Sequence, residues 1–250
     1  MRRGAIAAPP PLDVERCALF ADLDGTLAEI RPRPQDVGPD PPRDEVLARL
    51  TDGLQGALAI VSGRGLADLD RILGGRILAV AAVHGLVRRR SDGRVAEAAA
   101  AMVPKHVLEA MRAFQVAWPG LMVEDKGPSV ALHFRAVPSL ASACEAMAAQ
   151  LAQDSGLMVQ AGDRVVELRA PGPSKGEAVE AFMAEPPFAG RIPVFIGDDL
   201  TDENGFAGAE RLGGFGIVVG DRRPTRARYG LANVAAALAW LSDAAVSATR

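Results

Sequence analysis

The chain has 250 residues, of which 49% are hydrophobic and 24% are charged, and its formal net charge at pH 7 is −3. This length can hold one large domain or two modest ones, and the apolar share is ordinary for a protein with a packed core. The small negative charge excludes the overall basic field of a nucleic-acid-binding protein, and no apolar run approaches the ~18 residues of a membrane span, so we expect neither partner.

The N-terminal residues and the cysteines bear on the compartment. Residues 1–11 contain basic residues but no apolar stretch ahead of a run of prolines, which predicts a frayed tail rather than a signal peptide. Cys17 and Cys144 have neither zinc-site nor C-x-x-C spacing, so we expect both to be small buried hydrophobes. A reducing, cytoplasmic setting is therefore expected.

An apolar run near 17–22 predicts a first buried strand, and the string D-x-D-G-T-L of residues 22–27 follows it. Two carboxylates at the end of a strand are suited to holding a hard cation and to attacking phosphorus, because an ionised aspartate can form an aspartyl-phosphate. Gly25 has no Cβ and allows the chain to turn sharply after them. Asp22 and Asp24 are therefore candidate catalytic residues.

Helices and strands alternate in the next part of the chain. Apolar spacing predicts helices at 43–54 and 65–73 and short buried strands at 57–61 and 77–83, with a proline-rich loop at 31–42. This βαβα order predicts an α/β fold, a doubly wound parallel sheet with helices on both faces.

The strand at 57–61 ends in Ser62-Gly63-Arg64. A hydroxyl and a free backbone N–H then emerge at a second strand end, where they can bind an anion such as phosphate. Ser-Gly is also an ordinary turn, so this segment alone is a weak signal.

The pattern changes between 103 and 170. Residues 107–118 and 140–151 look helical, whereas 130–135 alternates with the period of a half-exposed strand. Residues 157–160 and 165–168 flank a turn that contains glycine, which predicts a hairpin. We therefore predict a discontinuous core of residues 1–102 and 171–250, with residues 103–170 inserted as an α+β cap over the strand ends.

The predicted cap carries polar residues that a simple cover does not need. Glu124 and Lys126 lie two positions apart, so in a strand they share a face, and Glu167 lies near the end of the hairpin. Fixed charged donors and acceptors of this kind discriminate among hydroxyl-rich ligands. His133 and Arg135 also share a face, which is either a solvated surface or part of the same site.

Two further segments follow the cap. Ser174 and Glu177 have capping-box spacing, which places Lys175 in the first turn of a helix, where its ammonium and the helix amides can face one anion. An apolar strand at 193–197 is followed by the acidic run of residues 198–203, and Mg²⁺ prefers such carboxylate ligands. A last core strand is predicted at 215–219.

Each of these segments alone has an ordinary structural explanation. Together, and in this order, they supply a nucleophile pair, a hydroxyl, a lysine and a distal acidic cluster, most of them at the ends of apolar strands. Ligands in open α/β sheets collect at the carboxyl ends of strands, so the combination indicates a phosphate-handling active site.

The string at 22–27 resembles the first motif of the haloacid-dehalogenase-like phosphohydrolases. The segments 123–127 and 131–135 resemble the E-x-K and H-Y-R block of the trehalose-6-phosphate phosphatases, and further matches of the same kind are Val83-His84-Gly85 and the segments 165–169, 174–177 and 197–203. The likeness spans residues 17–240 and is particularly close to short bacterial forms that have no fused synthase domain. Two positions depart from the family pattern. Phe134 stands where the family frequently has tyrosine, and Ala170 stands where a proline often follows the E-x-[RK] segment.

The resemblance implies a Mg²⁺-dependent hydrolysis of trehalose 6-phosphate through an aspartyl-phosphate, with a functional link to trehalose-6-phosphate synthase. By that resemblance Asp22 is the nucleophile and Asp24 protonates the leaving sugar oxygen and then activates water. The implied Mg²⁺ ligands are Asp22, the backbone carbonyl of Asp24, and Asp198.

The same resemblance assigns the remaining polar residues. Asp199 and Asp202 would support the metal site or orient the lysine. The residues expected to bind the phosphate end of the substrate are Ser62, Gly63, Arg64 and Lys175, and those expected to bind the distal glucose are Glu124, Lys126 and Glu167. His84 is either a supporting group or a buried core histidine.

Three other readings share parts of this pattern. A related phosphatase for another sugar phosphate would keep every core motif and differ in the cap. A sugar phosphomutase would keep the aspartyl-phosphate but return the phosphoryl group to a sugar. A receiver-type signalling domain also pairs acidic residues with a lysine on an α/β sheet, but it would be shorter and would lack the second domain.

Overall fold

The structure is a computed structural model that describes residues 6–77, 79–97 and 102–247. It divides into two compact units, Met1–Ala96 with Pro173–Arg250, and Glu97–Gly172. We call these the core unit and the cap unit and describe each by itself. The start of the expected N-terminal tail, residues 1–5, and Leu78 of the strand expected at 77–83 lie outside the described residues.

The core unit follows the alternating order that the sequence predicts. Its main elements are β1 (Cys17–Ala21), α1 (Pro41–Gly53), β2 (Leu58–Val61), α2 (Leu66–Leu73), β3 (Val80–Ala82), β4 (Val87–Arg89), β5 (Val95–Glu97), α5 (Lys175–Met183), β10 (Ile192–Gly197), α6 (Asp202–Arg211), β11 (Phe215–Val219), β12 (Tyr229–Leu231) and α7 (Val234–Ser247). Two short 3-10 turns, Pro34–Asp36 and Val83–Gly85, join some of them.

The sheet has the strand order β12-β11-β10-β1-β2-β3-β4-β5. Every neighbouring pair from β12 to β3 is parallel, which confirms the parallel core sheet. The antiparallel strand β4 beside β3, and the edge strands β5 and β12, were not predicted. These three strands have only three residues each, too few to show a clear apolar run.

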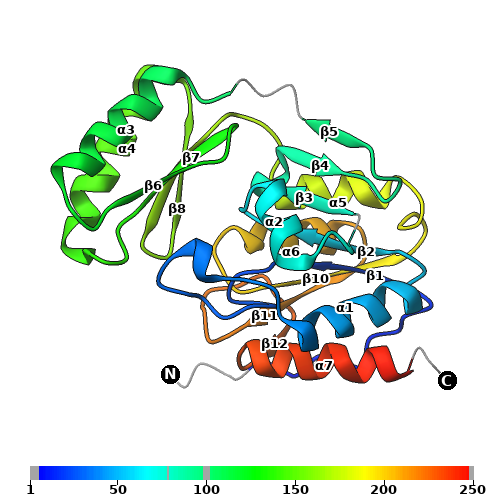
Figure 1. The fold of residues 1–250 in the computed structure, drawn as a ribbon. Coiled ribbons are helices and arrows are strands. Elements are labelled where there is room, and N and C mark those ends of the chain that lie inside the picture. The colour runs from blue at the N-terminus through cyan, green and yellow to red at the C-terminus, as the bar shows by residue number, and fades with distance from the viewer. Residues whose placement is uncertain (1–5, 78, 98–101, 248–250) are drawn as a thin grey trace. The chain divides into compact units, whose positions relative to one another are not determined.

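Helices cover both faces of the core sheet, as a doubly wound fold requires. In Figure 1, α1 and α7 lie side by side along one face, and α5 lies on the other. Phe20 of β1 packs against Phe182 of α5 and against Phe188, with ring centroids 6.1 and 5.4 Å apart. Phe195 of β10 meets Phe206 of α6 edge to face at 5.7 Å. These aromatic contacts anchor α5 and α6 to the sheet.

The helices α5 and α6 approach each other closely because both contain glycine at the contact. A Cβ on Gly176 would lie 2.3 Å from the backbone oxygen of Asn204, and a Cβ on Gly208 would lie 2.8 Å from Gly176. The backbones therefore touch directly at the start of α5. This contact fixes the first residue of α5 relative to the first residue of α6.

The cap unit is an antiparallel sheet with two helices. Its elements are α3 (Lys105–Ala117), β6 (Met122–Asp125), β7 (Ser129–His133), a 3-10 turn (Pro138–Leu140), α4 (Ala141–Ser155), β8 (Met158–Gly162) and β9 (Val165–Arg169). The strand order is β6-β7-β9-β8 and every pair is antiparallel. The predicted hairpin is present, but Gly162 still belongs to β8 and the turn consists of Asp163 and Arg164.

The apolar core of the cap unit follows from the alternation of its strands. Val130 and Leu132 of β7 and Val166 and Leu168 of β9 point to one face and pack in a cluster that includes residues of both helices. The intervening residues of the same strands, among them Glu167, therefore lie on the opposite face. This alternation gives the cap sheet one apolar face and one polar face.

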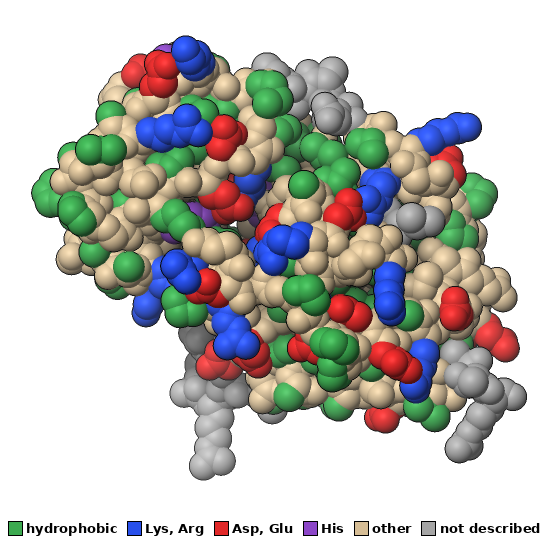
Figure 2. Space-filling view, in the orientation of Figure 1, with side chains coloured by type: hydrophobic (Ala, Val, Ile, Leu, Met, Phe, Trp, Pro, Cys, Tyr) green, Lys and Arg blue, Asp and Glu red, His purple; other side chains and the backbone are tan. Residues whose placement is uncertain are grey.

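Two expectations, one about the fold and one about the cysteines, can be compared with these observations. The predicted α/β core with an inserted α+β unit is confirmed, and Cys17 and Cys144 are both buried and free. Within the part of the chain that the structure describes, no helix combines the length and apolarity needed to cross a membrane. On the face shown in Figure 2, acidic and basic side chains are interspersed.

Candidate active site

The site begins where β1 ends. Asp22 follows directly, and its backbone N–H donates to Ile196 of β10 at 2.9 Å, which keeps the two strand ends in register. Gly25 then takes a left-handed conformation, with φ of +80°. A Cβ on Gly25 would lie 2.2 Å from a carboxylate oxygen of Asp198, so only glycine lets this turn pass so close to the acidic loop.

Lys175 is the first residue of α5 and lies buried between two carboxylates. Its Nζ is 2.7 Å from Asp202 and 3.1 Å from Asp22. The predicted capping box is present, because Ser174 accepts from the backbone of Glu177, whose side chain in turn accepts from the backbone of Ser174. The capping box fixes the first turn of α5, and this turn places the ammonium of Lys175 at the end of β1.

The acidic loop after β10 is folded on itself through Asp202. The oxygen of Asp202 that does not face Lys175 accepts from the backbone N–H groups of Asp198 and Asp199, at 2.9 and 3.0 Å. Asp199 accepts in turn from the backbone and hydroxyl of Thr201. Asp199 and Asp202 therefore both accept hydrogen bonds that organise the loop.

Asp198 keeps more of its capacity for a ligand. Its side chain accepts from the hydroxyl of Thr26 at 3.1 Å, and an ionised carboxylate has about four lone-pair sites. Asp22, Asp198 and Asp202 each offer one carboxylate oxygen, and these three atoms lie within 4.8 Å of one another. Carboxylate oxygens gathered this closely suit a hard divalent cation.

The charges of this cluster are not balanced by protein groups alone. Burial raises the pKa of Asp22 well above its ordinary value; the Lys175 charge opposes this, and Asp202 and Asp198 add to it. Burial, with the charges of Asp202 and Asp199, raises the pKa of Asp198 to about 8. Burial likewise raises the pKa of Asp202 to about 6, although Lys175 opposes it. Such crowded carboxyls fit a site that a cation completes.

The pKa values of the two remaining charged groups shift toward ionisation. Burial alone would raise the pKa of Asp199, but the Lys175 charge and the Thr201 hydrogen bond outweigh it and lower that pKa. Burial would lower the pKa of Lys175, but Asp202 and Asp22 outweigh it and raise that pKa well above its ordinary value. Lys175 is thus a fixed cation at this site.

The serine loop follows β2, the strand next to β1. Ser62 is buried, and its backbone N–H donates to Ala81 of β3 at 2.9 Å. The ring of His84 lies against Gly63, where a Cβ would come within 2.6 Å of it, and the backbone N–H of His84 donates to Ser62 at 2.9 Å. His84 is therefore buried and supports this turn.

Arg64 does not point freely toward a ligand. Its Nε and Nη2 donate to the two carboxylate oxygens of Asp24, at 2.6 and 2.7 Å, and its Nη1 donates to Asp68 and to the carbonyl of Pro34. Burial would lower the pKa of Arg64, but the hydrogen bonds and charges of Asp24 and Asp68 outweigh it and raise that pKa. The guanidinium is held by these acceptors.

A second polar cluster lies on the polar face of the cap sheet. Lys126 Nζ is 3.0 Å from Glu167 and 3.9 Å from Glu124, and Glu124 also contacts His133 at 2.9 Å. Burial would raise the pKa of Glu124, but the His133 hydrogen bond and the Lys126 charge outweigh it and lower that pKa. Arg135 lies outside this cluster and pairs with Asp163 at 2.8 Å.

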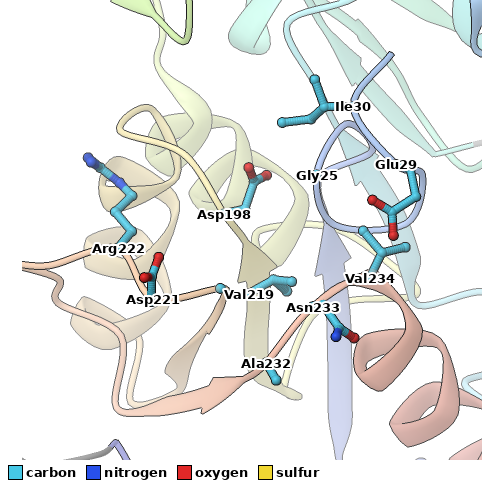
Figure 3. Close-up of a pocket in the computed structure, with 11 residues that line it drawn as sticks. Gly25, Glu29, Ile30, Asp198, Val219, Asp221, Arg222, Ala232, Asn233 and Val234 are labelled. Carbon is cyan, nitrogen blue, oxygen red and sulfur yellow. The ribbon is translucent and has the colours of Figure 1, made fainter.

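A cavity of about 340 Å³ in the core unit adjoins the carboxylate cluster of Asp22, Asp198 and Asp202, because Asp198 is one of its lining residues. Figure 3 shows Asp198 and the turn at Gly25, which both line this cavity. Its other lining residues are Glu29, Ile30, Val219, Gly220, Asp221, Arg222, Ala232, Asn233 and Val234. The cavity therefore reaches the acidic cluster from the carboxyl ends of β11 and β12.

The expected site residues fall into two groups in space. Asp22, Lys175, Asp198 and Asp202 come together in the core unit, whereas Glu124, Lys126 and Glu167 come together in the cap unit. Sequence reasoning gave no role to Thr26 or Asp68, or to His133 as a partner of Glu124. The T of the string at 22–27 could have indicated Thr26, and the i,i+4 spacing of Arg64 and Asp68 could have indicated their pairing.

Comparisons with known proteins show the family to which the chain belongs. The profile of the trehalose-phosphatase family matches residues 20–235. Trehalose-6-phosphate phosphatase from Escherichia coli strain K12 is 41% identical to this chain over 232 residues, covering 90% of this chain and 85% of that protein.

Solved structures with the same fold extend the comparison. The C-terminal domain of trehalose-6-phosphate phosphatase from Candida albicans is 23% identical, with a TM-score of 0.81, and covers 96% of this chain and 99% of its own. A phosphatase of the haloalkanoate (HAD) superfamily from Bacteroides thetaiotaomicron is 14% identical, with a TM-score of 0.59, and covers 93% of this chain and 95% of its own. At these identities the two structures show a shared fold, and that fold is the expected one.

Proposed function

The chain belongs to the trehalose-phosphatase family, and from this premise we propose that it hydrolyses trehalose 6-phosphate to trehalose and inorganic phosphate. One observation carries the proposal beyond family membership. The carboxylate of Asp22 lies 3.1 Å from the buried ammonium of Lys175 at the end of β1, so an attacking group and a fixed positive charge meet where a phosphate would bind.

The proposed reaction has two steps. In the first, an Asp22 oxygen forms a bond to phosphorus while the bond from phosphorus to the sugar oxygen breaks, and Asp24 gives that oxygen its proton. In the second, Asp24 takes a proton from water, the water oxygen bonds to the same phosphorus, and the Asp22 carboxylate is released. Splitting one hydrolysis into two displacements lowers the barrier that each must cross.

We propose Asp22, Asp198 and the backbone carbonyl of Asp24 as the ligands of a Mg²⁺. The carboxylate donor set and its raised pKa values fit a hard divalent cation. When bound, the cation would offset the negative charge that phosphate and carboxylates bring together. Asp199 and Asp202 are proposed as supports, because their oxygens already accept from the loop backbone and from Lys175.

The phosphate end of the substrate is proposed to bind at the serine loop and the lysine. Ser62 offers a hydroxyl, Gly63 offers a backbone N–H, and Lys175 offers a fixed positive charge. Phosphoryl transfer needs little covalent chemistry from the protein beyond the nucleophile, so positioned donors and cations supply most of the catalysis.

The sugar end is proposed to bind at Glu124, Lys126 and Glu167 of the cap unit. Charged groups fixed by mutual contacts of 3.0 and 3.9 Å can hydrogen-bond the hydroxyls of the distal glucose with little loss of side-chain entropy. Sugar preference is then set in the cap unit, and phosphoryl chemistry is carried out in the core unit.

The proposed setting is the cytoplasm, in functional linkage with a synthase that supplies the substrate. Cys17 and Cys144 are free and buried, which suits a reducing compartment. The synthase link follows from the substrate, because trehalose 6-phosphate must be made before it is hydrolysed.

The test is a comparison of phosphate release from a panel of sugar phosphates by the purified chain with Mg²⁺. We expect trehalose 6-phosphate to have the highest kcat/KM and free trehalose to be the product. A different preferred sugar phosphate would make the chain a phosphatase of another specificity. Transfer of the phosphoryl group to a second sugar, with no free phosphate, would make it a phosphomutase.

A further inference from the structure

Arg64 lies in the serine loop, where sequence reasoning places it among the substrate-binding residues, but its contacts indicate a different use. A guanidinium has five N–H donors, and four of those of Arg64 already have acceptors among the described residues: two oxygens of Asp24, one of Asp68, and the carbonyl of Pro34. Its side chain is only 6% exposed. Binding a phosphate with this group would require breaking contacts that the fold supplies.

The contact with Asp24 is the parallel, two-bond form. Nε and Nη2 of Arg64 meet the two carboxylate oxygens at 2.6 and 2.7 Å, and this geometry fixes both the place and the rotation of the carboxylate plane. Each oxygen keeps lone pairs that point away from the guanidinium. The Asp24 side chain is 35% exposed, whereas its Arg64 partner is enclosed.

Arg64 is itself held from behind. Asp68 lies one helical turn further on, in the first turn of α2, and accepts from Nη1 of Arg64. Arg71 on the next turn pairs with Asp68 at 2.7 Å and also donates to the carbonyl of Val37 at 2.8 Å. The guanidinium of Arg64 therefore connects the turn after β1 to the start of α2 and to the loop ahead of α1.

We propose that Arg64 is a positioning residue, which aims the Asp24 carboxyl group at the oxygen that leaves and then at the incoming water, and that Asp68 holds Arg64 in place. This inference rests on the proposed role of Asp24 in proton transfer. A misplacement of about 1 Å in a reacting group can cost roughly 100-fold in rate, so holding the Asp24 carboxyl group in one orientation should increase the rate.

The predicted signature depends on how much help the leaving group needs. Phenolate is a poor leaving group and needs a proton from Asp24, whereas p-nitrophenolate is a good one and needs little. The value of kcat/KM covers events up to the first irreversible step, which is transfer to Asp22. Misorientation of the Asp24 carboxyl group should therefore reduce kcat/KM for phenyl phosphate far more than for p-nitrophenyl phosphate.

The test measures kcat/KM for both aryl phosphates with the full-length wild-type chain and with Arg64→Lys, Arg64→Ala and Asp68→Asn, in the presence of Mg²⁺. Lysine keeps the charge but cannot make two parallel bonds to one carboxylate. We expect both Arg64 variants to lose roughly 10- to 100-fold more on phenyl phosphate than on p-nitrophenyl phosphate. Asp68→Asn, which alters no proposed catalytic group, should show the same bias in milder form.

The inhibition constant for inorganic phosphate gives a second readout, and it should stay within about twofold of wild type in all three variants. A raised inhibition constant together with equal losses on the two aryl phosphates would show that Arg64 binds phosphate and would overturn the inference. Wild-type activity in the Arg64→Lys variant would also overturn it. Arg49→Lys, at an exposed arginine paired with Glu45 on α1, controls for the substitution itself.

Failure of the proposed function would be distinguishable, because it would appear in the wild-type chain as a different preferred sugar phosphate. The aryl phosphate pair would still report the aim of Asp24 in that case. Thermal unfolding of each variant separates misorientation of the Asp24 carboxyl group from loss of the fold. Added guanidinium should recover part of the phenyl phosphate activity of Arg64→Ala.

Discussion

The contact between Asp22 and Lys175 joins the proposed nucleophile to a buried cation. A carboxylate that is 4% exposed loses most of its hydration, and the ammonium of Lys175, 3.1 Å away, favours its charged form. The same lysine also pairs with Asp202 at 2.7 Å, so one ammonium holds both the proposed nucleophile and the acidic loop.

Asp22→Asn tests the nucleophile. The substitution keeps the shape of the side chain but removes the charge that attacks phosphorus, so we predict that phosphate release from trehalose 6-phosphate falls to near background. Circular dichroism and thermal unfolding should show an intact fold. Turnover above a few per cent of wild type would contradict the assignment of Asp22.

The pKa of Asp198 leads to a prediction about stability and pH. Its folded value of about 8 and that of Asp202, about 6, both exceed the unfolded value of ~4, so between these limits the folded state binds more protons than the unfolded chain. Without metal, the free energy of unfolding contributed by these groups should therefore decrease as pH rises from ~4 to ~8.

Urea unfolding of the EDTA-treated chain at pH 6 and pH 8.5 measures this effect. We expect lower stability at pH 8.5 from these two groups, a smaller difference when Mg²⁺ is present, and a smaller difference in Asp198→Asn. A pH dependence that is the same in wild type and in Asp198→Asn would contradict the inferred charge crowding.

At the scale of elements, the contact between α5 and α6 places the lysine. Gly176 follows Lys175 directly, and Asn204 follows Asp202 by two residues, so the backbone contact between them sets the distance between the two charges. The geometry of the charged groups thus depends on a backbone packing contact in which no polar side chain takes part.

Gly176→Ala tests this dependence. The added Cβ would lie 2.3 Å from the Asn204 oxygen and would push the helices apart, so we predict a loss of about 1–3 kcal/mol in the free energy of unfolding and a clear fall in kcat. Gly38→Ala, where a Cβ would meet nothing within 4 Å, is the matched control. Equal stability of the two variants would contradict the close helix contact.

The polar face of the cap sheet leads to a prediction about specificity. Glu124→Ala and Lys126→Ala should each lower kcat/KM for trehalose 6-phosphate by roughly ten- to a hundred-fold, because a hydrogen bond to a charged group is worth ~1.5–3 kcal/mol. Both should hydrolyse p-nitrophenyl phosphate almost normally. Asp154→Ala, at an exposed residue of α4, is the control, and equal losses on both substrates would show that the cluster is structural.

At the scale of the whole molecule, the sequence predicted the strand ends better than the contacts between them. Asp22 and Asp198 could be placed because each follows an apolar run, and parallel strands bring their carboxyl ends to one edge. The pairing of Arg64 with Asp24 could not be predicted, because it joins residues 40 positions apart through the direction of one side chain.

The same limit explains what was missed in the fold. The short strands β4, β5 and β12 have no apolar run of their own, and β4 pairs with β3 through backbone hydrogen bonds that composition does not show. In the cap unit, strand alternation placed Glu124 and Lys126 on one face, but only the register of β7 with β9 brings Glu167 to them. The alternating pattern of side chains predicts the strands of the cap unit, and the register between these strands brings their polar residues into one cluster.

Transfer of the phosphoryl group to Asp22 is the central step of the proposed function, and rapid-quench labelling measures this transfer directly. The wild-type chain is mixed with trehalose 6-phosphate that carries a radioactive phosphate, quenched with acid within the first turnover, digested and mapped. We predict label on the peptide that contains Asp22, released by hydroxylamine as expected of an acyl phosphate. Free phosphate appearing at the normal rate with no labelled peptide at any time, or with label on another residue, would contradict the account.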